Sequence, residues 1–407
     1  ILLKNINCNG ILSDICIEGT RIKKIVPVGG CSGGHIEIAS GVEVMDCEGK
    51  TAMPAFINMH THAAMSLMRG IEEDVQLHEW LDKIWKTEAR IDEEFVYWGT
   101  KVACLEMIKT GTVTFNDQYW YSLAARKAAV EMGLRPVVSY VALDHNDHEE
   151  TERQKEQMQE VYEKSLAMKD NGIFETAIHA IYSTSEELML WVTEFARNHG
   201  LRIHIHISET EKEVADRLGI LGPDVLAAHT LWLSDNDIDI LGKHQVNCVH
   251  NINSNAKLAS GYKFRYNELR DAGANVCIGT DGCASSNNLD MLEALKTSAL
   301  FQKAWRQDTK ALPLDELIKL ATVNGAKALG LETGKIEEGM LADILIVDTE
   351  NSFFVSPAPF LSNFIYSAHS DCIQYMISSG RFVMRNRRVK DEAQIISSAQ
   401  DQLVKIM

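Results

Sequence analysis

The chain has 407 residues, which allows two or three domains of ordinary size, or one large barrel with an added module. Its composition, 45% hydrophobic and 24% charged, excludes a disordered, collagen-like or coiled-coil protein. Acidic residues outnumber basic ones by 57 to 40, and the net charge of -17 would repel a phosphate backbone, so we expect no nucleic-acid partner.

Two features of the chain favour a cytoplasmic protein without a membrane partner. No run approaches the ~20 apolar residues that a membrane-spanning helix needs, and the N-terminus lacks a basic region followed by an apolar segment. The nine cysteines are scattered without a CxxC pair, as is typical of free thiols in a reducing compartment. Because the chain begins with Ile1 and not with Met, we expect a few native residues to precede it.

Both ends of the chain are rich in short predicted strands. The strands and hairpins expected there are Leu2–Leu3, Ser13–Ile17, Arg21–Val28, Ala342–Asp348, Ile373–Ser378 and a hairpin around Arg381–Val389 with Asn386 at its tip. No flexible linker separates these ends from the middle. We therefore expect residues 1–53 and 334–407, the latter with a C-terminal helix, to form one small domain.

Between residues 54 and 333, short apolar runs alternate with longer amphipathic stretches, as in repeated βα units of a parallel sheet. The predicted strands are Ala55–Met59, Thr112–Phe115, Pro136–Ala142, Thr176–Ile181, Arg202–Ile207, Val225–His229, Gln245–Val249 and Ala274–Gly279. Intervening segments such as Ser185–His199 and Asn288–Phe301 have helical spacing. Eight such repeats predict an α/β fold with a closed, TIM-like (β/α)8 barrel.

Polar and titratable side chains collect at the C-terminal ends of these predicted strands, where barrel enzymes place their active sites. They are His60 and His62 after the first strand, His179 after the fourth, His206 and Glu209 after the fifth, His229 after the sixth, His250 after the seventh and Asp281 after the eighth. This one-sided distribution predicts an active site at that end of the barrel.

His60 and His62 are two residues apart on an extended segment, so both imidazoles project from one face and could hold one cation. Taken alone, the pair is equally typical of two hydrogen-bonded histidines in a loop. His206 and Asp281 complete the three or four nitrogen and oxygen ligands that a catalytic metal needs. His204 shares the face of His206 but lies further from the strand end, and we assign it to the core.

Two acidic residues have a chemical and an ordinary interpretation. Asp281 lies in Gly279-Thr280-Asp281-Gly282, where small residues allow the backbone to turn the carboxylate toward the barrel axis; a lone Asp there would be a turn residue with an Asx hydrogen bond. Glu209 follows His206 by three residues, which suits a proton shuttle beside the metal. It also suits the first turn of a helix, and the two roles are compatible.

An ordered set of motifs runs through nearly the whole chain. The motifs are PAFINMHTHAAMSLMRG at 54–70, EWLDKIWKTE at 79–88, HISETEKE at 206–213, AAHTLWL at 227–233, VHNINSNAKLASG at 249–261, GTDGCASSNNLDM at 279–291 and GKIEEGMLADILIVD at 334–348. With them the chain resembles the amidohydrolase superfamily, specifically the branch of methylthioadenosine and S-adenosylhomocysteine deaminases and their chlorohydrolase relatives. The resemblance implies a barrel with a small β-sandwich and one divalent metal, usually zinc, with Fe2+ and Mn2+ as alternatives.

The resemblance also implies roles for individual residues. It places the metal ligands on His60, His62, His206 and Asp281, the set reached above from spacing. It places ribose contacts on Glu88 and His179, the adenine ring beside Glu209, and the wall of the nucleoside pocket on Trp80. The ordinary alternatives are a solvated helix charge for Glu88, a capped strand end for His179 and core packing for Trp80.

Two departures from related enzymes narrow these expectations. The fourth predicted strand has His179 and no Lys that could bridge two metals, which favours a single ion. The segment after the third strand, Asp144–Glu150, is acidic, and only Arg153 is near it. Similar enzymes that accept S-adenosylhomocysteine use arginines there, so we expect no preference for a charged amino-acid tail.

The sequence thus predicts a hydrolase of C–N bonds in cyclic amidines, which removes the 6-amino group of an adenine nucleoside altered at the 5′ position. Candidate substrates are methylthioadenosine, 5′-deoxyadenosine and adenosine, with S-adenosylhomocysteine left open. We expect Asp281 to move the water proton, Glu209 to protonate the ring and His229 to hydrogen-bond the attacking oxygen.

Three questions stay open at this point. One alternative function is a chlorohydrolase or an aminohydrolase acting on a triazine, guanine or pterin ring, although Glu209 argues against dechlorination because chloride leaves without a proton. Another is a barrel that has kept the fold as a non-catalytic scaffold. A homo-oligomer is also compatible with the sequence.

Overall fold

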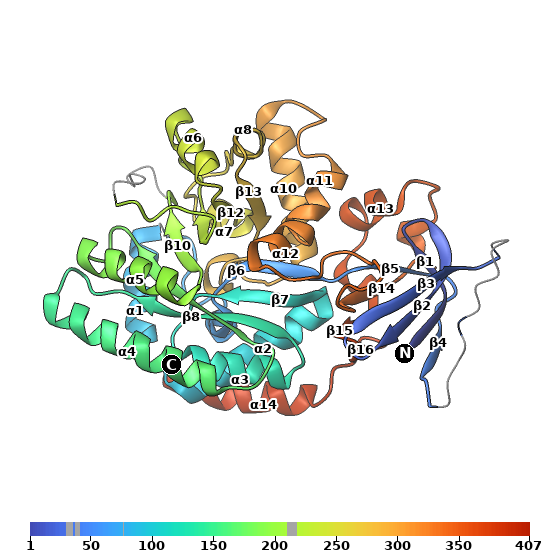
Figure 1. The fold of residues 1–407 in the computed structure, drawn as a ribbon, viewed down its shortest axis with the longest axis horizontal. Coiled ribbons are helices and arrows are strands. Elements are labelled where there is room, and N and C mark those ends of the chain that lie inside the picture. The colour runs from blue at the N-terminus through green and yellow to red at the C-terminus, as the bar shows by residue number, and fades with distance from the viewer. Residues whose placement is uncertain (30–35, 37–40, 76, 210–217) are drawn as a thin grey trace.

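The computed structural model describes residues 1–29, 36, 41–75, 77–209 and 218–407. Two eight-stranded sheets organise the chain (Figure 1). One sheet is parallel and curls into a barrel surrounded by helices. The other is formed by the two ends of the chain and lies beside the barrel. The α/β fold predicted from the sequence, a TIM-like barrel with a small β-sandwich, is confirmed.

The barrel strands follow one another in chain order, and each pairs in parallel with the next. They are β6 (Phe56–Thr61), β7 (Thr112–Asp117), β8 (Arg135–Ala142), β9 (Ile173–Ala180), β10 (Ile203–Ile207), β11 (Val225–His229), β12 (Asn247–His250) and β13 (Asn275–Ile278). Nearly every residue in them is buried, as is typical of parallel strands covered on both faces. All eight predicted strands are present, and their ends differ from the prediction by a few residues.

Helices connect the strands and cover the outside of the barrel (Figure 1). They are η1 (Ala63–Met68), α1 (Leu77–Glu88), α2 (Glu93–Thr110), α3 (Ser122–Glu131), α4 (His148–Ala167), α5 (Glu186–His199), α6 (Asp235–Lys243), α7 (Ile252–Lys257), α8 (Tyr266–Ala272), α9 (Cys283–Ser286), α10 (Met291–Arg306), α11 (Leu314–Leu320) and α12 (Val323–Leu329). Local signals explain their limits. Ser185 caps α5 by accepting a hydrogen bond from the Leu188 amide, and Gly200 ends it with a φ of 64°.

An apolar core fills the N-terminal end of the barrel. Buried side chains of five strands pack there against α12; they are Ile57, Met59, Val137, Leu226, Val249, Cys277, Ala326, Ala328 and Leu329. The α12 helix approaches closely because Gly325 has no side chain: a Cβ there would lie 2.9 Å from Ile57 Cγ2. This apolar core closes the end of the barrel opposite the predicted active site.

The second sheet joins both ends of the chain. Its strands are β1 (Leu2–Cys8), β2 (Ile11–Glu18), β3 (Arg21–Pro27), β4 (Val44–Asp46), β5 (Lys50–Pro54), β14 (Ile344–Asp348), β15 (Ile373–Ser378) and β16 (Arg381–Arg385). The β5 strand pairs with both β1 and β14, which links the two ends. The expected hairpin tip is present, since Asn386 and Arg387 both have positive φ, but only an isolated bridge from Arg385 to Arg388 follows β16.

The remaining short helices lie in the C-terminal part of the chain. They are η2 (Ser352–Phe354), α13 (Phe360–Tyr366), η3 (Ser370–Cys372), α14 (Glu392–Gln402) and η4 (Leu403–Lys405). The α14 helix runs along the barrel near α2 (Figure 1), and the Arg90 guanidinium donates to the Ile406 carbonyl at 2.6 Å. The last residues of the chain therefore pack on barrel helices.

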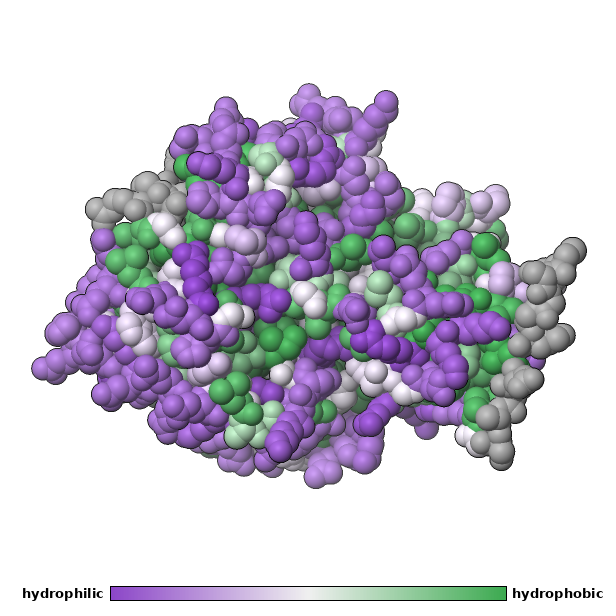
Figure 2. Space-filling model, viewed as in Figure 1, coloured by the Kyte–Doolittle hydropathy of each residue, from purple (hydrophilic) through white to green (hydrophobic). Residues whose placement is uncertain are grey.

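The surface and the cysteines agree with the composition. On the face shown in Figure 2, hydrophilic side chains cover most of the surface, with hydrophobic ones between them and on the small sheet. Each cysteine in the described ranges is a free thiol, and nearly all are buried.

None of the helices described is both long and apolar enough to cross a membrane.

Candidate active site

The C-terminal ends of the strands surround a small cavity of about 60 Å³. Eight of the nine residues predicted from the sequence for metal binding, catalysis or substrate contact line it. They are His62, Trp80, Glu88, His179, His206, Glu209, His229 and Asp281. The ninth, His60, is fully buried, and its ring centroid lies 4.9 Å from that of His62.

The four predicted metal ligands come together in this cavity. His60 Nε2 and His62 Nε2 lie 3.5 Å and 3.3 Å from Asp281 Oδ1. Candidate ligand atoms of His60, His62 and His206 lie within 4.8 Å of one another, and so do those of His60, His229 and Asp281. The arrangement offers three imidazoles and one carboxylate to a single ion, with His229 beside them.

The outer nitrogen of each surrounding histidine has a hydrogen-bond acceptor. His62 Nδ1 lies 2.5 Å from the Gln118 carbonyl oxygen and His206 Nδ1 lies 2.7 Å from that of His179. A ring nitrogen that donates to a carbonyl leaves the other nitrogen with its lone pair free. The Nε2 atoms, which face the centre, are therefore the available metal ligands.

Burial sets the protonation state of these side chains. It holds the pKa of His60 and of His206 well below the usual histidine value, and it also lowers the pKa of His62. Burial opposes ionisation of Asp281, but its close contact with His60 and the neighbouring imidazoles keep its pKa well below the usual value. Neutral imidazoles and an ionised carboxylate are the forms that bind metals.

The backbone around Asp281 is shaped by close contacts. Asp281 has a φ of 63°, its amide donates to the His60 carbonyl at 2.9 Å, and its Oδ1 accepts from the Gly282 amide at 2.7 Å. Asp281 therefore forms a local turn and also directs its carboxylate toward the predicted metal ligands. A Cβ at Gly279 would lie 2.8 Å from the His60 backbone, so glycine permits the approach of β13 to β6 that closes the barrel.

His229 lies between two carboxylates. Its Nε2 is 3.8 Å from Glu209 Oε2 and 3.9 Å from Asp281 Oδ2, and its Nδ1 is 2.8 Å from Asn255 Oδ1. Ser208, just after β10, and His229, at the end of β11, both have a positive φ, so the backbone turns where these strands end beside the site. The expected helix start after Glu209 falls on residues 210–217, which lie outside the described residues.

The predicted substrate contacts lie on the other side of the cavity. Burial raises the pKa of Glu88 to about 7, against the effect of hydrogen bonds with Tyr119 and Trp120. His179 Nδ1 lies 2.7 Å from Ser183 Oγ, and burial lowers its pKa to about 3. Trp80 is buried and packs in the core, and it also lines the cavity.

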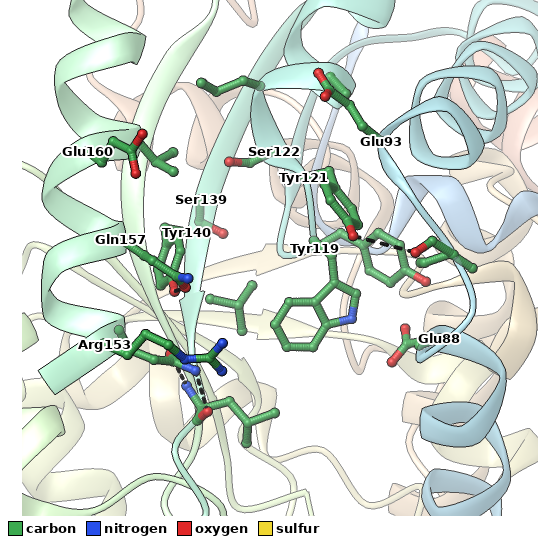
Figure 3. A pocket seen from close by; sticks show the side chains of 18 of the residues that line it. Glu88, Glu93, Tyr119, Tyr121, Ser122, Ser139, Tyr140, Arg153, Gln157 and Glu160 are labelled. Atoms are coloured by element: carbon green, nitrogen blue, oxygen red, sulfur yellow. Dashed lines mark hydrogen bonds between the residues drawn. The ribbon is translucent and has the colours of Figure 1, made fainter. Parts of the chain in front are cut away.

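A larger pocket of about 790 Å³ adjoins the small cavity. The two share Trp85, Glu88, Tyr119, Trp120 and Val141. Figure 3 shows this pocket between Glu88 on one side and the α4 side chains Arg153, Gln157 and Glu160 on the other. The space beside the predicted metal centre therefore extends toward α4.

The acidic segment around the start of α4 makes several internal contacts. Asp144 is buried and accepts hydrogen bonds from Thr151 Oγ1 at 2.7 Å and from the Ser185 amide at 2.8 Å. Asp147 caps α4. Arg153 Nε donates to Glu150 Oε2 at 2.9 Å. Two of these carboxylates thus hold the loop together, and a third is paired with the arginine.

Several residues of the site were not singled out from the sequence. Asn255 orients His229, while Tyr119, Trp120 and Trp85 form walls. Asn255 lies within the motif at 249–261, which was its available signal. Glu175 contacts His204 from the middle of β9, and a charged residue inside an apolar run was the signal for it.

Comparisons with known proteins show the family of the chain. The model of the Amidohydrolase family matches residues 51–383. The 5′-deoxyadenosine deaminase of Methanoregula boonei is 39% identical over 98% of this chain and 93% of its own. The 5-methylthioadenosine/S-adenosylhomocysteine deaminase 1 of Archaeoglobus fulgidus is 38% identical over 98% of both chains.

Solved structures share the fold of this chain. An adenosine deaminase from Xanthomonas campestris with bound zinc has a TM-score of 0.88 at 28% identity and covers 97% of this chain and 93% of its own. The atrazine chlorohydrolase of Arthrobacter aurescens complexed with zinc has a TM-score of 0.89 at 20% identity over 99% of both chains, which shows a shared fold. The family match and the relatives' identities together show that this chain belongs to the amidohydrolase family.

Proposed function

We propose that the protein is a metal-dependent aminohydrolase that removes the 6-amino group of adenine nucleosides modified at the 5′ position. The observation that carries this proposal is the position of His229 between Glu209 and Asp281, next to the imidazoles of the predicted metal ligands. The relatives named as deaminases of 5′-deoxyadenosine and of methylthioadenosine support it at 38–39% identity. Its partner is then a small nucleoside.

The metal is a divalent ion, for which we propose a single zinc held by His60, His62, His206 and Asp281. His60 Nε2 supports the fit, because it is buried and has no hydrogen-bond partner among the described residues. The zinc-bound adenosine deaminase supports the choice of metal. When bound, the ion lowers the pKa of a water molecule toward neutrality. The absence of Lys from β9 favours one ion over two.

Two side chains transfer protons in this proposal, and a third stabilises charge. Asp281 accepts a proton from the attacking water, while Glu209 donates one to the ring nitrogen next to the carbon under attack. His229 hydrogen-bonds the attacking oxygen and stabilises the charge that develops on it. As the C–N bond breaks, Asp281 gives its proton to the departing amine, which leaves as ammonia, and the remaining hydroxyl proton passes to Glu209 as the 6-oxo group forms.

The substrate would occupy both cavities. Small-molecule pockets measure about 300–1,000 Å³, so the inner cavity alone is too small and the adjoining 790 Å³ provides the remaining space. Glu88 and His179 are proposed to bind the ribose hydroxyls, with Trp80 at the wall. A site built for these hydroxyls is left with unpaired polar atoms when they are missing, so free adenine is expected to be a poor substrate.

The test is a side-by-side assay of the purified protein with adenosine, 5′-deoxyadenosine, methylthioadenosine and S-adenosylhomocysteine. Ammonia release and conversion of the adenine ring to hypoxanthine are measured together with bound metal. We expect turnover of at least one of the first three. A fully metal-loaded protein that releases ammonia from none of the four, but chloride from a chlorotriazine, would contradict the proposal in favour of the chlorohydrolase alternative.

A further inference from the structure

A line of three buried side chains leads away from the predicted metal centre. His60 Nδ1, on the side of the ring opposite the centre, lies 2.9 Å from His204 Nε2. The other nitrogen of that ring, His204 Nδ1, lies 3.2 Å from Glu175 Oε1. All three side chains are completely buried, so no bulk water competes for these contacts.

In the other three histidines of the centre, Nδ1 faces an oxygen and not a second imidazole. His62 and His206 use backbone carbonyls as the partner of Nδ1, and His229 uses the side chain of Asn255. A carbonyl oxygen only accepts, so its histidine must donate from Nδ1. His60 faces an imidazole, which can either donate or accept, and this contact by itself leaves the proton position on His60 undecided.

Glu175 removes that ambiguity. Its carboxylate oxygen lies 3.2 Å from His204 Nδ1, and a lone pair on that nitrogen would be repelled by the oxygen, so His204 carries its proton on Nδ1. A neutral His204 then presents a lone pair on Nε2, and His60 must donate to it from Nδ1. His60 Nε2, which faces Asp281, is left with its lone pair. We infer that Glu175 and His204 are positioning residues that hold His60 in its metal-binding tautomer and orientation, an inference that rests on the proposed metal centre.

The surroundings of Glu175 favour this role over a purely structural one. Among the described residues its carboxylate has one ion-pair partner, His204, and neither oxygen has a hydrogen bond that meets normal geometry. A buried carboxylate with so few partners costs stability instead of adding to it. Asp343 gives the contrast: it is equally buried and is bound by Arg135, Thr333 and the Ser379 amide.

The inference predicts an effect on metal affinity. Glu175→Gln keeps the shape but can present either an N–H or a carbonyl to His204, so the proton position on His60 is no longer imposed. His204→Leu removes the acceptor outright, whereas His204→Gln keeps an amide oxygen that His60 can donate to. Loss of such outer partners typically weakens metal binding by about 10- to 100-fold.

The experiment follows transfer of Zn2+ from the purified holoprotein to a chromophoric chelator. We expect Glu175→Gln and His204→Leu each to weaken zinc affinity by about 10- to 100-fold, and the double variant to be no weaker than His204→Leu alone. His204→Gln should stay near wild type. The matched control, Asp343→Asn, neutralises another buried carboxylate and should lower the melting temperature without changing zinc affinity.

Each result decides the matter. The inference would be overturned if Glu175→Gln bound zinc as tightly as wild type. It would also be overturned if the double variant lost affinity by the product of the two single losses. The proposed function would stand in either case. A wild-type protein without zinc affinity would overturn both. If Glu175→Gln does not fold, the comparison of His204→Leu with His204→Gln still decides, since equal affinities in that pair contradict a role as acceptor.

Discussion

His62 Nε2 and Asp281 Oδ1 lie 3.3 Å apart, although they follow the first and the last strand of the barrel. The barrel brings them together by closing: the Asp281 amide donates to the His60 carbonyl, and β13 comes to lie beside β6. A metal held by both residues would link the first strand of the barrel to the last one. Metal binding should therefore stabilise the fold as well as serve the chemistry.

The first prediction concerns the metal ligands. His206→Ala removes an imidazole whose Nδ1 is anchored on the His179 carbonyl and whose other nitrogen faces the centre. We expect the variant to lose both bound zinc and deaminase activity, and wild-type protein to contain about one ion per chain. Metal analysis of both proteins checks this. Full zinc content in the variant would show that the ligand set is wrong.

Acid should release the metal only below the ordinary histidine range. The pKa values of His60, His62 and His206 are lowered by burial from the unfolded value of about 6.5, so protons compete with zinc only at lower pH. In metal-free protein, the stability linked to these neutral histidines is complete above about pH 6.5 and is lost as pH falls below it. Zinc release and the free energy of unfolding, followed against pH, check both statements; half-release at or above pH 6.5 would contradict them.

Glu209→Gln should separate binding from chemistry. The amide keeps the size of the side chain and cannot shuttle the proton, so fold and zinc content should be retained while kcat falls by about 10²- to 10⁴-fold. Circular dichroism and metal analysis serve as controls for the kinetics. A variant that deaminates adenosine analogues at nearly the wild-type rate would exclude Glu209 as the proton donor.

Glu88 should give the enzyme a dependence on pH near neutrality. Its pKa is raised to about 7 by burial, and ribose hydroxyls donate best to the ionised carboxylate, so kcat/KM should fall as pH drops through about 7. In Glu88→Gln this dependence should disappear and kcat/KM should be about 10- to 100-fold lower, the loss expected for hydrogen bonds to a charged group. An unchanged pH profile in the variant would argue that Glu88 does not contact the substrate.

The 5′ substituent is the subject of the last prediction. In the pocket shared with α4, Arg153 is already paired with Glu150, so the carboxylate of S-adenosylhomocysteine would have to displace that partner. We expect methylthioadenosine, 5′-deoxyadenosine and adenosine to have higher kcat/KM than S-adenosylhomocysteine. Arg153→Ala should leave this order unchanged. If S-adenosylhomocysteine ranks first and the variant abolishes its advantage, the arginine is a carboxylate site.

Much of the architecture could be predicted from local patterns. Apolar runs of strand length recur with helical segments between them, and each predicted run corresponds to a barrel strand; Val225–His229 agrees at both ends. The histidine pair at His60 and His62 could be recognised because side chains on a strand alternate with a period of two. Such signals lie within a few residues of one another, so no knowledge of distant contacts is needed to see them.

Local patterns along the chain thus predicted the barrel strands and the gathering of His60, His62, His206 and Asp281 at their C-terminal ends, because the length of apolar runs and the alternation of side chains need no distant contacts to be recognised. The tertiary structure decided which contacts those side chains make. The sequence showed Asp144 only as part of an acidic segment, and the structure adds its hydrogen bonds with Thr151 and Ser185. Likewise, the approach of Glu175 to His204 depends on the register between β9 and β10, which hydrogen bonds between the strands fix and no spacing along either strand reveals.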